Sequence, residues 1–524
     1  MRSFASFGLA LGAILCTTRA LPTHDRPPRT EEESLRLTNA TAFAITYGYP
    51  LAQYAVAVGP VLASVGPNAF QHHRNTVMAE EDDEDEDEVP PGRPDPDVLY
   101  SAAAIDLSTS NVVLTIPKIN DGRYFVVSFY DVWSNNFANI GRLSMTVPGK
   151  YLVQIADKPW QIGFVESDEG TTDYVGNIFF PTVHGLVMPQ IHVRNNSNET
   201  DLNAAREAQG SIKLTPEVRK GSPLGPRLTS ELLGDGLLDS VAQRPAGQLR
   251  RHEVRDLLDI VARFDPFNRP WKPREGATVT HILEEAGLAQ GRYEPDSDVQ
   301  YETAVRIVDQ GIRAAEKQLH PYGNGWFGFP RGLTGSFKEQ YAVRSLAASM
   351  DYLQLLSSEV LSLSWLGSSV HQGAKDGISL DRDDALVVTF PSGKPPITVS
   401  GFWSLSLHDL EGGFIPNPLN RFGLGSGSNL TENGGSNQTH PIGGNGTQTS
   451  DQPINALWSW STPFSILIQS QDVPPPANWT TNWLPAPTRG DKFLMNLRLV
   501  GTKHPMIAGR FIYPTVTRRR AIVD

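Results

Sequence analysis

The spacing of the apolar residues changes twice along this chain of 524 residues. From Asp97 to Arg194, short alternating runs separated by turn residues are typical of strands. From Asp201 to about Leu366, apolar residues recur three and four apart, as in amphipathic helices. The alternation of apolar and polar residues that is typical of strands returns after Ala385. Because long helices do not alternate with the strands, this pattern predicts a mainly β protein with α (α+β), in which a helical connector joins two antiparallel β-sandwich or jelly-roll-like domains.

These changes of spacing divide the sequence into segments. We expect a signal peptide at 1–20, an extended leader at 21–38, an N-terminal β domain at 39–217, a helical connector at 218–366, a C-terminal β domain at 367–514 and a basic tail at 515–524. An acidic loop (80–88) interrupts the first β domain, and a Gly/Asn-rich insert (423–451) interrupts the second. A chain of this length is too long for one hydrophobic core.

The first residues have the features of a secretory signal. Arg2 precedes an apolar run at 4–16, and small residues around Ala20 suit a signal peptidase. The run is too short to span a membrane. The only cysteine, Cys16, lies within it, so cleavage would leave a mature chain without disulfides or thiolate metal ligands. We therefore expect a secreted, extracellular protein that is held together by core packing.

Sequons of the form Asn-x-Ser/Thr support the same expectation, and three of them cluster in the Gly/Asn-rich insert. The sequons are at Asn39, Asn195, Asn198, Asn429, Asn437, Asn445 and Asn478. A secreted chain with these sites would be a glycoprotein.

The charge balance excludes some partners. The formal net charge is −12, and the unbroken acidic run at 80–88 supplies most of it. Nucleic acid is therefore not an expected partner. We interpret the acidic run as a solvated loop that remains disordered because its charges repel one another.

The common catalytic signatures are absent from the sequence. Residues 323–328 have the glycine spacing of a dinucleotide loop, but no predicted strand precedes them and Pro330 follows where a helix should begin. The chain has no Gly-x-Ser-x-Gly elbow and no phosphate-binding loop. Scattered histidines, among them His184, His192 and His408, are more often packed residues than metal ligands. We predict neither a cofactor nor a bound metal.

Two sets of motifs resemble known families. The N-terminal set, which resembles domain of unknown function 1254, comprises 96–101, 106–107, 116–117, 122–124, 130–131, Asn135, Gly141 and Arg194. The C-terminal set, which resembles domain of unknown function 1214, comprises 402–405, 417–422, 483–487 and 497–499. The connector adds 324–326, Tyr341 and Arg344. The resemblance implies a two-domain, mostly β protein that is often exported and has no established reaction.

Polar and aromatic side chains that packing does not readily explain are the candidates for a site. The candidate acids, bases and proton donors are Asp106, Asp131 and Tyr100. The candidate ligand-binding residues, in which the two tryptophans would serve as stacking surfaces, are Arg123, Arg194, Trp326, Arg344, Trp403, Asn417 and Arg421. The structural alternative is that buried arginines form ion pairs that fix the sheets, for example Arg123 with Asp106 or Asp131.

Two classes of function are consistent with these residues. The first is a secreted hydrolase or lyase that acts on a glycan or another polar substrate. The second is a non-catalytic extracellular protein that binds a glycan or small polar ligand. A pocket holding two carboxylates in unlike surroundings would favour the enzyme, and a shallow aromatic strip would favour binding. In both cases we expect the ligand where the two β units meet. The sequence leaves the oligomeric state open.

Overall fold

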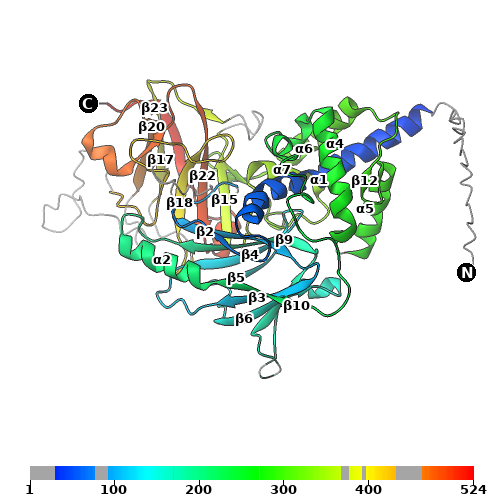
Figure 1. Ribbon diagram of the computed structural model, residues 1–524. Helices are drawn as coiled ribbons and strands as arrows, with labels where there is room; N and C mark the ends of the chain where they lie inside the picture. Colours follow the sequence, from blue (N-terminus) through cyan, green and yellow to red (C-terminus); the bar gives the residue numbers. More distant parts are fainter. Residues whose placement is uncertain are drawn as a thin grey trace, which may run out of the picture.

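The structure is a computed structural model that describes residues 30–76, 92–168, 170, 172–270, 272–367, 377–391, 397–431 and 463–523. The predicted signal peptide, the acidic run 80–88 and residues 432–451 of the insert lie outside the described residues. Figure 1 shows two β domains beside a block of helices, with the first helix running through that block. The predicted α+β class, with antiparallel sheets joined by helices, is confirmed.

The N-terminal domain contains two five-stranded sheets. The first has the order β1 (Gln71–His72), β2 (Val98–Asp106), β9 (His184–His192), β4 (Phe125–Asp131) and β5 (Asn136–Gly141). The second has the order β10 (Lys213–Val218), β3 (Ser110–Ile116), β6 (Gly149–Ile155), β8 (Gly176–Phe180) and β7 (Gly163–Glu166). Helix α2 (Glu199–Ser211) packs beside β2 and β9. Only the β6–β8 pair is parallel among the described pairs of this domain.

The first sheet of this domain is buried on both faces. One face contributes Leu99, Ile105 and Phe129 to the core between the two sheets. The opposite face contributes Tyr100 and Tyr130 to the core shared with the helices. All nine residues of β2 are buried for this reason. The result is a layered arrangement of sheet, sheet and helices, and the inner sheet faces the rest of the molecule.

The helical block combines the start of the chain with the predicted connector. Its helices are α1 (Glu31–Ser64), α3 (Asp239–Ala242), α4 (Arg251–Phe264), α5 (Pro273–Glu285), α6 (Tyr301–Glu316) and α7 (Tyr341–Met350). A two-stranded hairpin of β11 (Leu288–Ala289) and β12 (Arg292–Tyr293) lies between α5 and α6. Short 3-10 helices elsewhere occupy Pro159–Gln161, Ala246–Gln248, Asp265–Phe267 and Ala477–Asn482.

The C-terminal domain also packs two sheets around one core. The larger sheet has the order β13 (His320–Gly323), β14 (Trp326–Gly328), β15 (Val360–Trp365), β22 (Lys492–Val500), β18 (Trp403–His408) and β19 (Gly423–Gly425), with β16 (Ile378–Ser379) also pairing with β22. The smaller sheet has the order β21 (Trp483–Ala486), β20 (Phe464–Ser470), β17 (Asp384–Phe390) and β23 (Thr515–Arg520). Helix α8 (His504–Ile507) precedes β23.

The beginning of the described chain differs from the prediction. We expected 21–38 to be extended and 39–217 to be a β domain, but α1 is one helix of 34 residues that starts at Glu31 and continues through Pro50. Thr30 begins it with a capping box, accepting from the Glu33 N–H while the Glu33 carboxylate accepts from the Thr30 N–H. Because α1 packs against α4, α5, α6 and α7, tertiary contacts outweigh the hydrogen bond that Pro50 removes.

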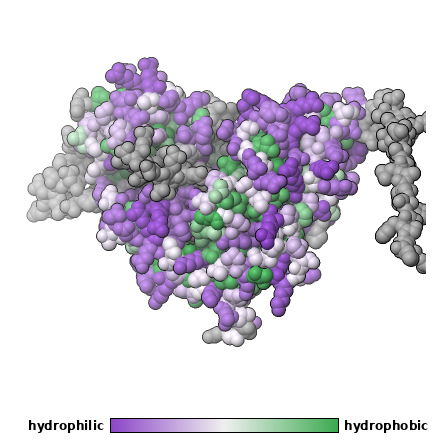
Figure 2. Space-filling view, in the orientation of Figure 1, coloured by the Kyte–Doolittle hydropathy of each residue, from purple (hydrophilic) through white to green (hydrophobic). Residues whose placement is uncertain are grey.

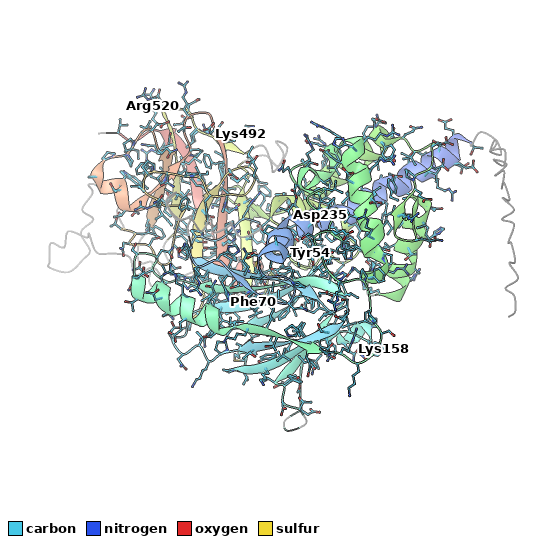
Figure 3. The ribbon with its side chains drawn as sticks, viewed as in Figure 1. Tyr54, Phe70, Lys158, Asp235, Lys492 and Arg520 are labelled. Carbon is cyan, nitrogen blue, oxygen red and sulfur yellow. The ribbon has the colours of Figure 1, made fainter. Side chains whose placement is uncertain are left out.

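The turn around Gly122 does not close a hairpin, because β3 and β4 belong to different sheets of the sandwich. Three other expectations were wrong. Strands β13, β14 and β15, which we assigned to the connector, belong to the larger C-terminal sheet. The predicted basic tail forms β23, which pairs with β17, and Figure 3 places Arg520 at the outer end of this domain. In addition, the first residues of the predicted flexible insert form β19, which pairs with β18.

Two contacts hold α1 in place. The Tyr54 hydroxyl, labelled in Figure 3, donates a 3.0 Å hydrogen bond to the Gly185 carbonyl of β9. Gly48 lies so close to α4 that an added Cβ would meet Cγ2 of Val261 at 2.4 Å. Helix α1 therefore ties the helical block to the N-terminal sheet.

The surface is mainly hydrophilic on the face shown in Figure 2, and apolar side chains gather near its centre. Exposed apolar residues near the end of α1 and in the neighbouring loop include Val56, Val65 and Leu237. Among the described residues, no helix has both the length and the apolar character needed to cross a membrane.

Candidate functional site

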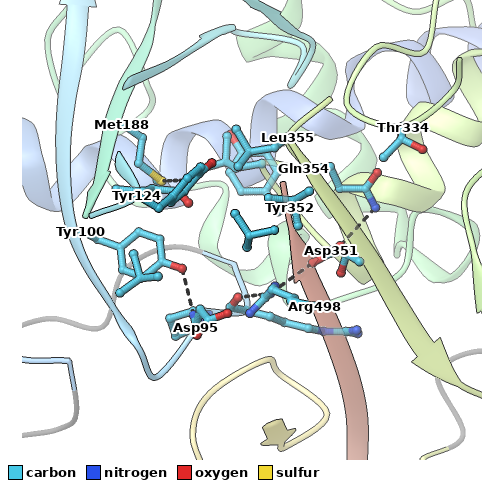
Figure 4. Close-up of a pocket in the computed structure, with 18 of the residues that line it drawn as sticks. Asp95, Tyr100, Tyr124, Met188, Thr334, Asp351, Tyr352, Gln354, Leu355 and Arg498 are labelled. Atoms are coloured by element: carbon cyan, nitrogen blue, oxygen red, sulfur yellow. Dashed lines mark hydrogen bonds and ion pairs between the residues drawn. The ribbon is translucent and has the colours of Figure 1, made fainter. Parts of the chain in front are cut away.

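A cavity lies where the N-terminal sheet, the connector and the C-terminal sheet meet (Figure 4). The centre of a water molecule can reach about 70 Å³ of it, which is room for a few water molecules. The site therefore suits a small ligand or one small group of a larger ligand. The polar residues in its lining are Arg93, Asp95, Tyr100, Tyr124, Gln190, Thr334, Asp351, Tyr352, Gln354, Ser362 and Arg498. This position agrees with our expectation of a site between the two β units.

Strand alternation explains how the C-terminal domain contributes to the cavity. In β22, Leu497 and Leu499 point into the core of that domain, so Arg498 and Val500 point to the opposite face of the sheet. The neighbouring strands behave in the same way, and Ser362 of β15 lies on the cavity side. This face carries Ser362, Asn496 and Arg498 as well as the apolar Val360 and Val500. It remains buried because the N-terminal domain covers it.

Two further segments form large parts of the other walls. Residues 93–95 precede β2, and Tyr100 follows within that strand. Residues 351–355 follow the end of α7 and pass through Leu353, which has a positive φ of 62°. This conformation is uncommon for a leucine, and the 2.8 Å hydrogen bond from the Tyr130 hydroxyl to the Leu353 carbonyl helps to hold it. The turn directs neighbouring polar side chains into the cavity.

Arg498 joins the walls of the cavity. Its Nη2 donates a hydrogen bond to the Arg93 carbonyl and lies 3.7 Å from Oδ1 of Asp351. The Arg93 Nη1 donates to Oδ1 of Asn496 over 3.4 Å. On the opposite side, the Tyr100 hydroxyl accepts a 2.9 Å hydrogen bond from the Asp95 N–H. Two buried cations therefore share the cavity with two carboxylates.

Several polar atoms in this cavity have no hydrogen-bond partner among the described residues. They are Nη1 of Arg498, the hydroxyl of Tyr352 and Oε1 of Gln354. Tyr352 and Gln354 are each more than nine-tenths buried. An unsatisfied buried polar atom costs about 1–3 kcal/mol. All three atoms are closed off from water, so water in the cavity does not reach them.

Burial sets the protonation states in and beside the cavity. It raises the pKa of Tyr100 and of Tyr352, so both hydroxyls keep their protons at neutral pH. It lowers the pKa of Arg93 to about 10, which leaves the guanidinium charged. Burial, followed by the charges of Arg498 and Arg93, holds the pKa of His408 well below its ordinary value. His408 is therefore neutral.

Of the predicted acids and proton donors, only Tyr100 lines the cavity. Asp106 accepts hydrogen bonds from the backbone N–H groups of Ser108 and Leu228, at 2.8 and 3.0 Å. Asp131 accepts three hydrogen bonds from the loop that follows β4. Neither carboxylate pairs with Arg123. Both hold local structure, so the structure does not bring the three candidates together.

The predicted arginines of the N-terminal half are structural. Arg123 forms ion pairs with Asp121 at 2.6 Å and Asp201 at 2.9 Å, which corrects the partners we expected. Arg194 donates a 2.5 Å hydrogen bond to the Asp121 carbonyl. Arg344 donates to a backbone carbonyl of α1 and lies among three aromatic rings. For Arg123, a structural ion pair that fixes the sheets is therefore a better explanation than ligand binding.

The predicted residues of the C-terminal half also lie outside the cavity lining. Trp326 and Trp403 are buried in the core of that domain, so neither offers a stacking surface. The Asn417 side chain bonds to the backbone of its own turn. The Arg421 Nη1 donates to the carbonyls of Thr480 and Trp483, at 2.6 and 2.8 Å. Of Tyr100, Trp326 and Arg421, only Tyr100 lines the cavity.

Most cavity residues were absent from the sequence-based list. Asp351, Tyr352 and Gln354 lie in a segment that we predicted as helix, although α7 ends at Met350. Arg93 follows the acidic run, where we expected only a loop. Arg498 gave the one usable signal, because a charge inside an alternating apolar strand needs partners. His184 and His192 are the first and last residues of the single strand β9. The described residues contain no group of three or more side chains arranged to hold a metal ion.

Comparison with protein families supports the two-domain division. The family described as "Protein of unknown function (DUF1254)" matches residues 67–216. The family described as "Protein of unknown function (DUF1214)" matches residues 370–504. Both matches confirm the resemblance noted in the sequence, in the same order. The cavity draws Tyr100 from the first matched segment and Arg498 from the second. No curated protein matches the chain.

Solved structures give one informative likeness. The VPA0106 protein of Vibrio parahaemolyticus is 12% identical, and the alignment covers 92% of this chain and 100% of that chain with a TM-score of 0.52. An uncharacterized protein of Burkholderia cenocepacia is 11% identical, with 93% of this chain and 94% of that chain covered and a TM-score of 0.39. At this identity, the first likeness shows a shared fold and nothing further.

Proposed function

This chain is a two-domain protein that carries a DUF1254 domain followed by a DUF1214 domain, and we propose that it binds a small anionic ligand in the cavity between them. The observation that carries this proposal is the pair of largely buried guanidinium groups, Arg93 and Arg498, in the lining of one cavity. The contact of Arg498 with Asp351, at 3.7 Å, is longer than a hydrogen bond. A carboxylate or phosphate group in the cavity would be attracted to both positive charges.

The side chains around Arg498 favour binding over nucleophilic catalysis. The tyrosines of the cavity stay protonated because burial raises their pKa, so they act as hydrogen-bond donors. The described lining contains no serine–histidine pair, since Ser362 is its only serine and no histidine lines it. Of the two functions that the sequence suggested, these side chains support the non-catalytic binding protein.

The test measures thermal unfolding with acetate, glycolate and inorganic phosphate, each compared with chloride at equal ionic strength. A ligand that binds only the folded state raises Tm. We expect at least one anion to stabilise wild type, and the effect to disappear in Arg498→Met. Arg421→Met is the matched control, because Arg421 bonds to backbone carbonyls outside the cavity. If no anion stabilises wild type, or if Arg498→Met keeps the full effect, the proposal is wrong.

A hydrolase or lyase acting on a glycan or other polar substrate is the second candidate, because two carboxylates line the cavity in unlike surroundings. Asp95 is almost fully buried and accepts a hydrogen bond from Ser404, whereas Asp351 is partly exposed beside Arg498. Turnover of a glycan library by wild type, with loss of turnover in a folded Asp351→Asn variant, would establish it. If wild type binds anions but turns over no glycan, only the binding function remains.

We also propose that the chain is exported and carries N-linked glycans. Four of the sequon asparagines are exposed, at Asn39, Asn198, Asn429 and Asn478. Asn195 is half-buried and its Oδ1 accepts a hydrogen bond from the Ser197 N–H, while Asn437 and Asn445 lie outside the described residues. Glycopeptide analysis of protein collected from the medium of a secreting host tests this. Retention of the chain inside that host, or a secreted chain without glycans, would refute it.

A further inference from the structure

Resting on the proposed anion binding, we infer that the ligand is an aliphatic carboxylate with a short alkyl chain. The inference comes from the way in which charged and apolar side chains divide the lining of the cavity. They occupy two neighbouring rows on one face of the larger C-terminal sheet. A ligand that fits both rows must be charged at one end and apolar at the other.

The first row is polar and crosses three strands. Arg498 of β22 is paired with Ser362 of β15 on one side and with Ser404 of β18 on the other. The Arg498 guanidinium donates to the carbonyl of Arg93. The Arg93 guanidinium extends further along β22, to the side chain of Asn496. Both positive charges therefore lie at one end of this face.

The second row, in the opposite direction along β22, is apolar. Val500 is paired with Val360 of β15, and its N–H donates a 2.8 Å hydrogen bond to the Phe402 carbonyl. All three side chains line the cavity and belong to the core shared with the helices. The Tyr124 ring packs edge-on against Phe402 at 5.8 Å, and its hydroxyl donates to Glu359. This end of the cavity therefore presents mainly hydrocarbon and ring surfaces.

The opposite wall shows the same division. In Figure 4, Tyr124 and Met188 lie at one side of the close-up, and Asp95 and Arg498 lie at the other. A second charged group on the ligand would lose its hydration beside the apolar row without gaining a partner there. The division therefore favours a monocarboxylate over a dicarboxylate.

The spacing of the rows sets the length of the ligand. Successive residues on one face of a strand are about 7 Å apart, so the apolar row begins about that far from Arg498 along β22. A carboxylate beside the guanidinium groups can direct an alkyl chain of a few carbons toward Val360 and Val500. The cavity has room for only a few water molecules, which excludes a long fatty acid that lies wholly within it. We expect a chain about as long as that of butyrate.

The experiment measures the affinity of the full chain by calorimetry for five probes at equal ionic strength. Butyrate has the expected form, acetate lacks most of the chain, octanoate is too long, succinate carries a second carboxylate, and 1-butanol lacks the charge. Burial of two additional CH₂ groups should make butyrate bind about ten-fold more tightly than acetate. The other three probes should also bind more weakly than butyrate.

Two variants test the apolar row. Val500→Thr keeps the shape of the side chain but adds a hydroxyl, so butyrate should bind several-fold more weakly while acetate is unchanged. Val360→Ile fills part of the apolar end and should exclude butyrate but not acetate. Val388→Thr is the matched control, because Val388 is buried in the core of the same domain, away from the cavity, and both affinities should stay unchanged. Melting temperatures without ligand show which variants fold, and the probes on wild type decide the inference even if one does not.

The outcomes separate this inference from the proposed function. Equal affinity for acetate and butyrate, tighter binding of succinate or octanoate, binding of phosphate alone, or an undiminished preference for butyrate in both folded variants would overturn the aliphatic carboxylate while the anion site remains. If no anion binds, or if 1-butanol binds as tightly as butyrate, both proposals are wrong.

Discussion

The Ser404 hydroxyl of β18 donates a 2.5 Å hydrogen bond to Oδ2 of Asp95. Both residues are buried, and they belong to different β domains. Asp95 also accepts the Asp97 N–H at 3.0 Å through its other oxygen. The contact therefore joins the polar face of the larger C-terminal sheet to the segment that precedes β2, immediately beside the cavity.

Replacing Ser404 with Ala should destabilise the protein by about 1–3 kcal/mol, because it leaves one oxygen of a buried carboxylate without its donor. Chemical denaturation measures this change. Ser465→Ala is the control, since its hydroxyl pairs with Thr389 in a half-buried position within one domain. We expect the control to cost clearly less. If both variants lose the same free energy of unfolding, the hydrogen bond between Ser404 and Asp95 stabilises the protein no more than a bond within one domain.

Arg123 and Arg194 both contact Asp121, but their burial differs. The Arg123 side chain is 1% exposed and that of Arg194 is 40% exposed. Arg123→Met should destabilise the protein by about 1–3 kcal/mol, because it removes the ion pairs of a buried guanidinium with Asp121 and Asp201, whose carboxylates keep some access to water. Arg194→Met should cost less than about 1 kcal/mol. Urea unfolding of both variants compares them, and similar effects would contradict the structural role of Arg123.

The pH dependence of stability should include a contribution from His192, which stacks on Phe402 at 3.9 Å. Burial, with the charges of Arg194 and Arg123, lowers its pKa to about 3 from the ordinary 6.5. Below pH 6.5 this histidine takes up a proton in the unfolded chain but not in the folded chain. The free energy of unfolding therefore decreases as the pH is lowered from 6.5 to 3, and His192 contributes about 1.4 kcal/mol of this decrease per pH unit.

A His192→Phe variant isolates that contribution, because Phe keeps a ring on Phe402 and cannot titrate. At pH 7.5 the variant should differ little from wild type. At pH 5 it should be relatively more stable, by about 2 kcal/mol. Melting curves across this range test the prediction. The other buried histidines are common to both proteins, so a constant difference at every pH would show that His192 does not titrate as described.

Gly48 should not tolerate a side chain, because an added Cβ would lie 2.4 Å from Cγ2 of Val261. Gly48→Ala should therefore destabilise the protein by about 1–3 kcal/mol, since valine has little freedom to rotate. In α6, Gly311 has open space, with Cβ of Ala342 at 4.0 Å. Gly311→Ala should be neutral or stabilising. Thermal unfolding of both variants gives the comparison, and equal behaviour would exclude close packing of α1 on α4.

Sequence patterns predicted helices and strands well where the backbone adopts the conformation that its own residues favour. The alternation of 402–408 predicted strand β18, and that of 493–499 predicted β22. The prediction failed where tertiary contacts decided. Pro50 should end a helix by itself, but four packed helices stabilise α1 through it. Likewise, Gly122 marks a turn correctly, but a turn does not reveal which sheet the next strand joins.

The candidate site depended even more on long-range contacts. Tyr100 was found because it belongs to a recognised motif, and the site was expected between the β units. Asp351 and Gln354 could not be selected, because their role follows from a chain turn that brings them to Arg498. The polar side chains that were selected mostly bond to their own neighbourhoods, as Asp131 and Asn417 do.

By itself, the sequence determined the class of the fold, the order of its two β units and the family resemblance, because periodicity and short motifs are local properties of a chain. Tertiary structure alone decided which strands share a sheet and where the cavity lies. Arg498 donates to the carbonyl of Arg93 across 405 positions of the chain. Such a contact depends on the packing of both domains, and no local pattern records it.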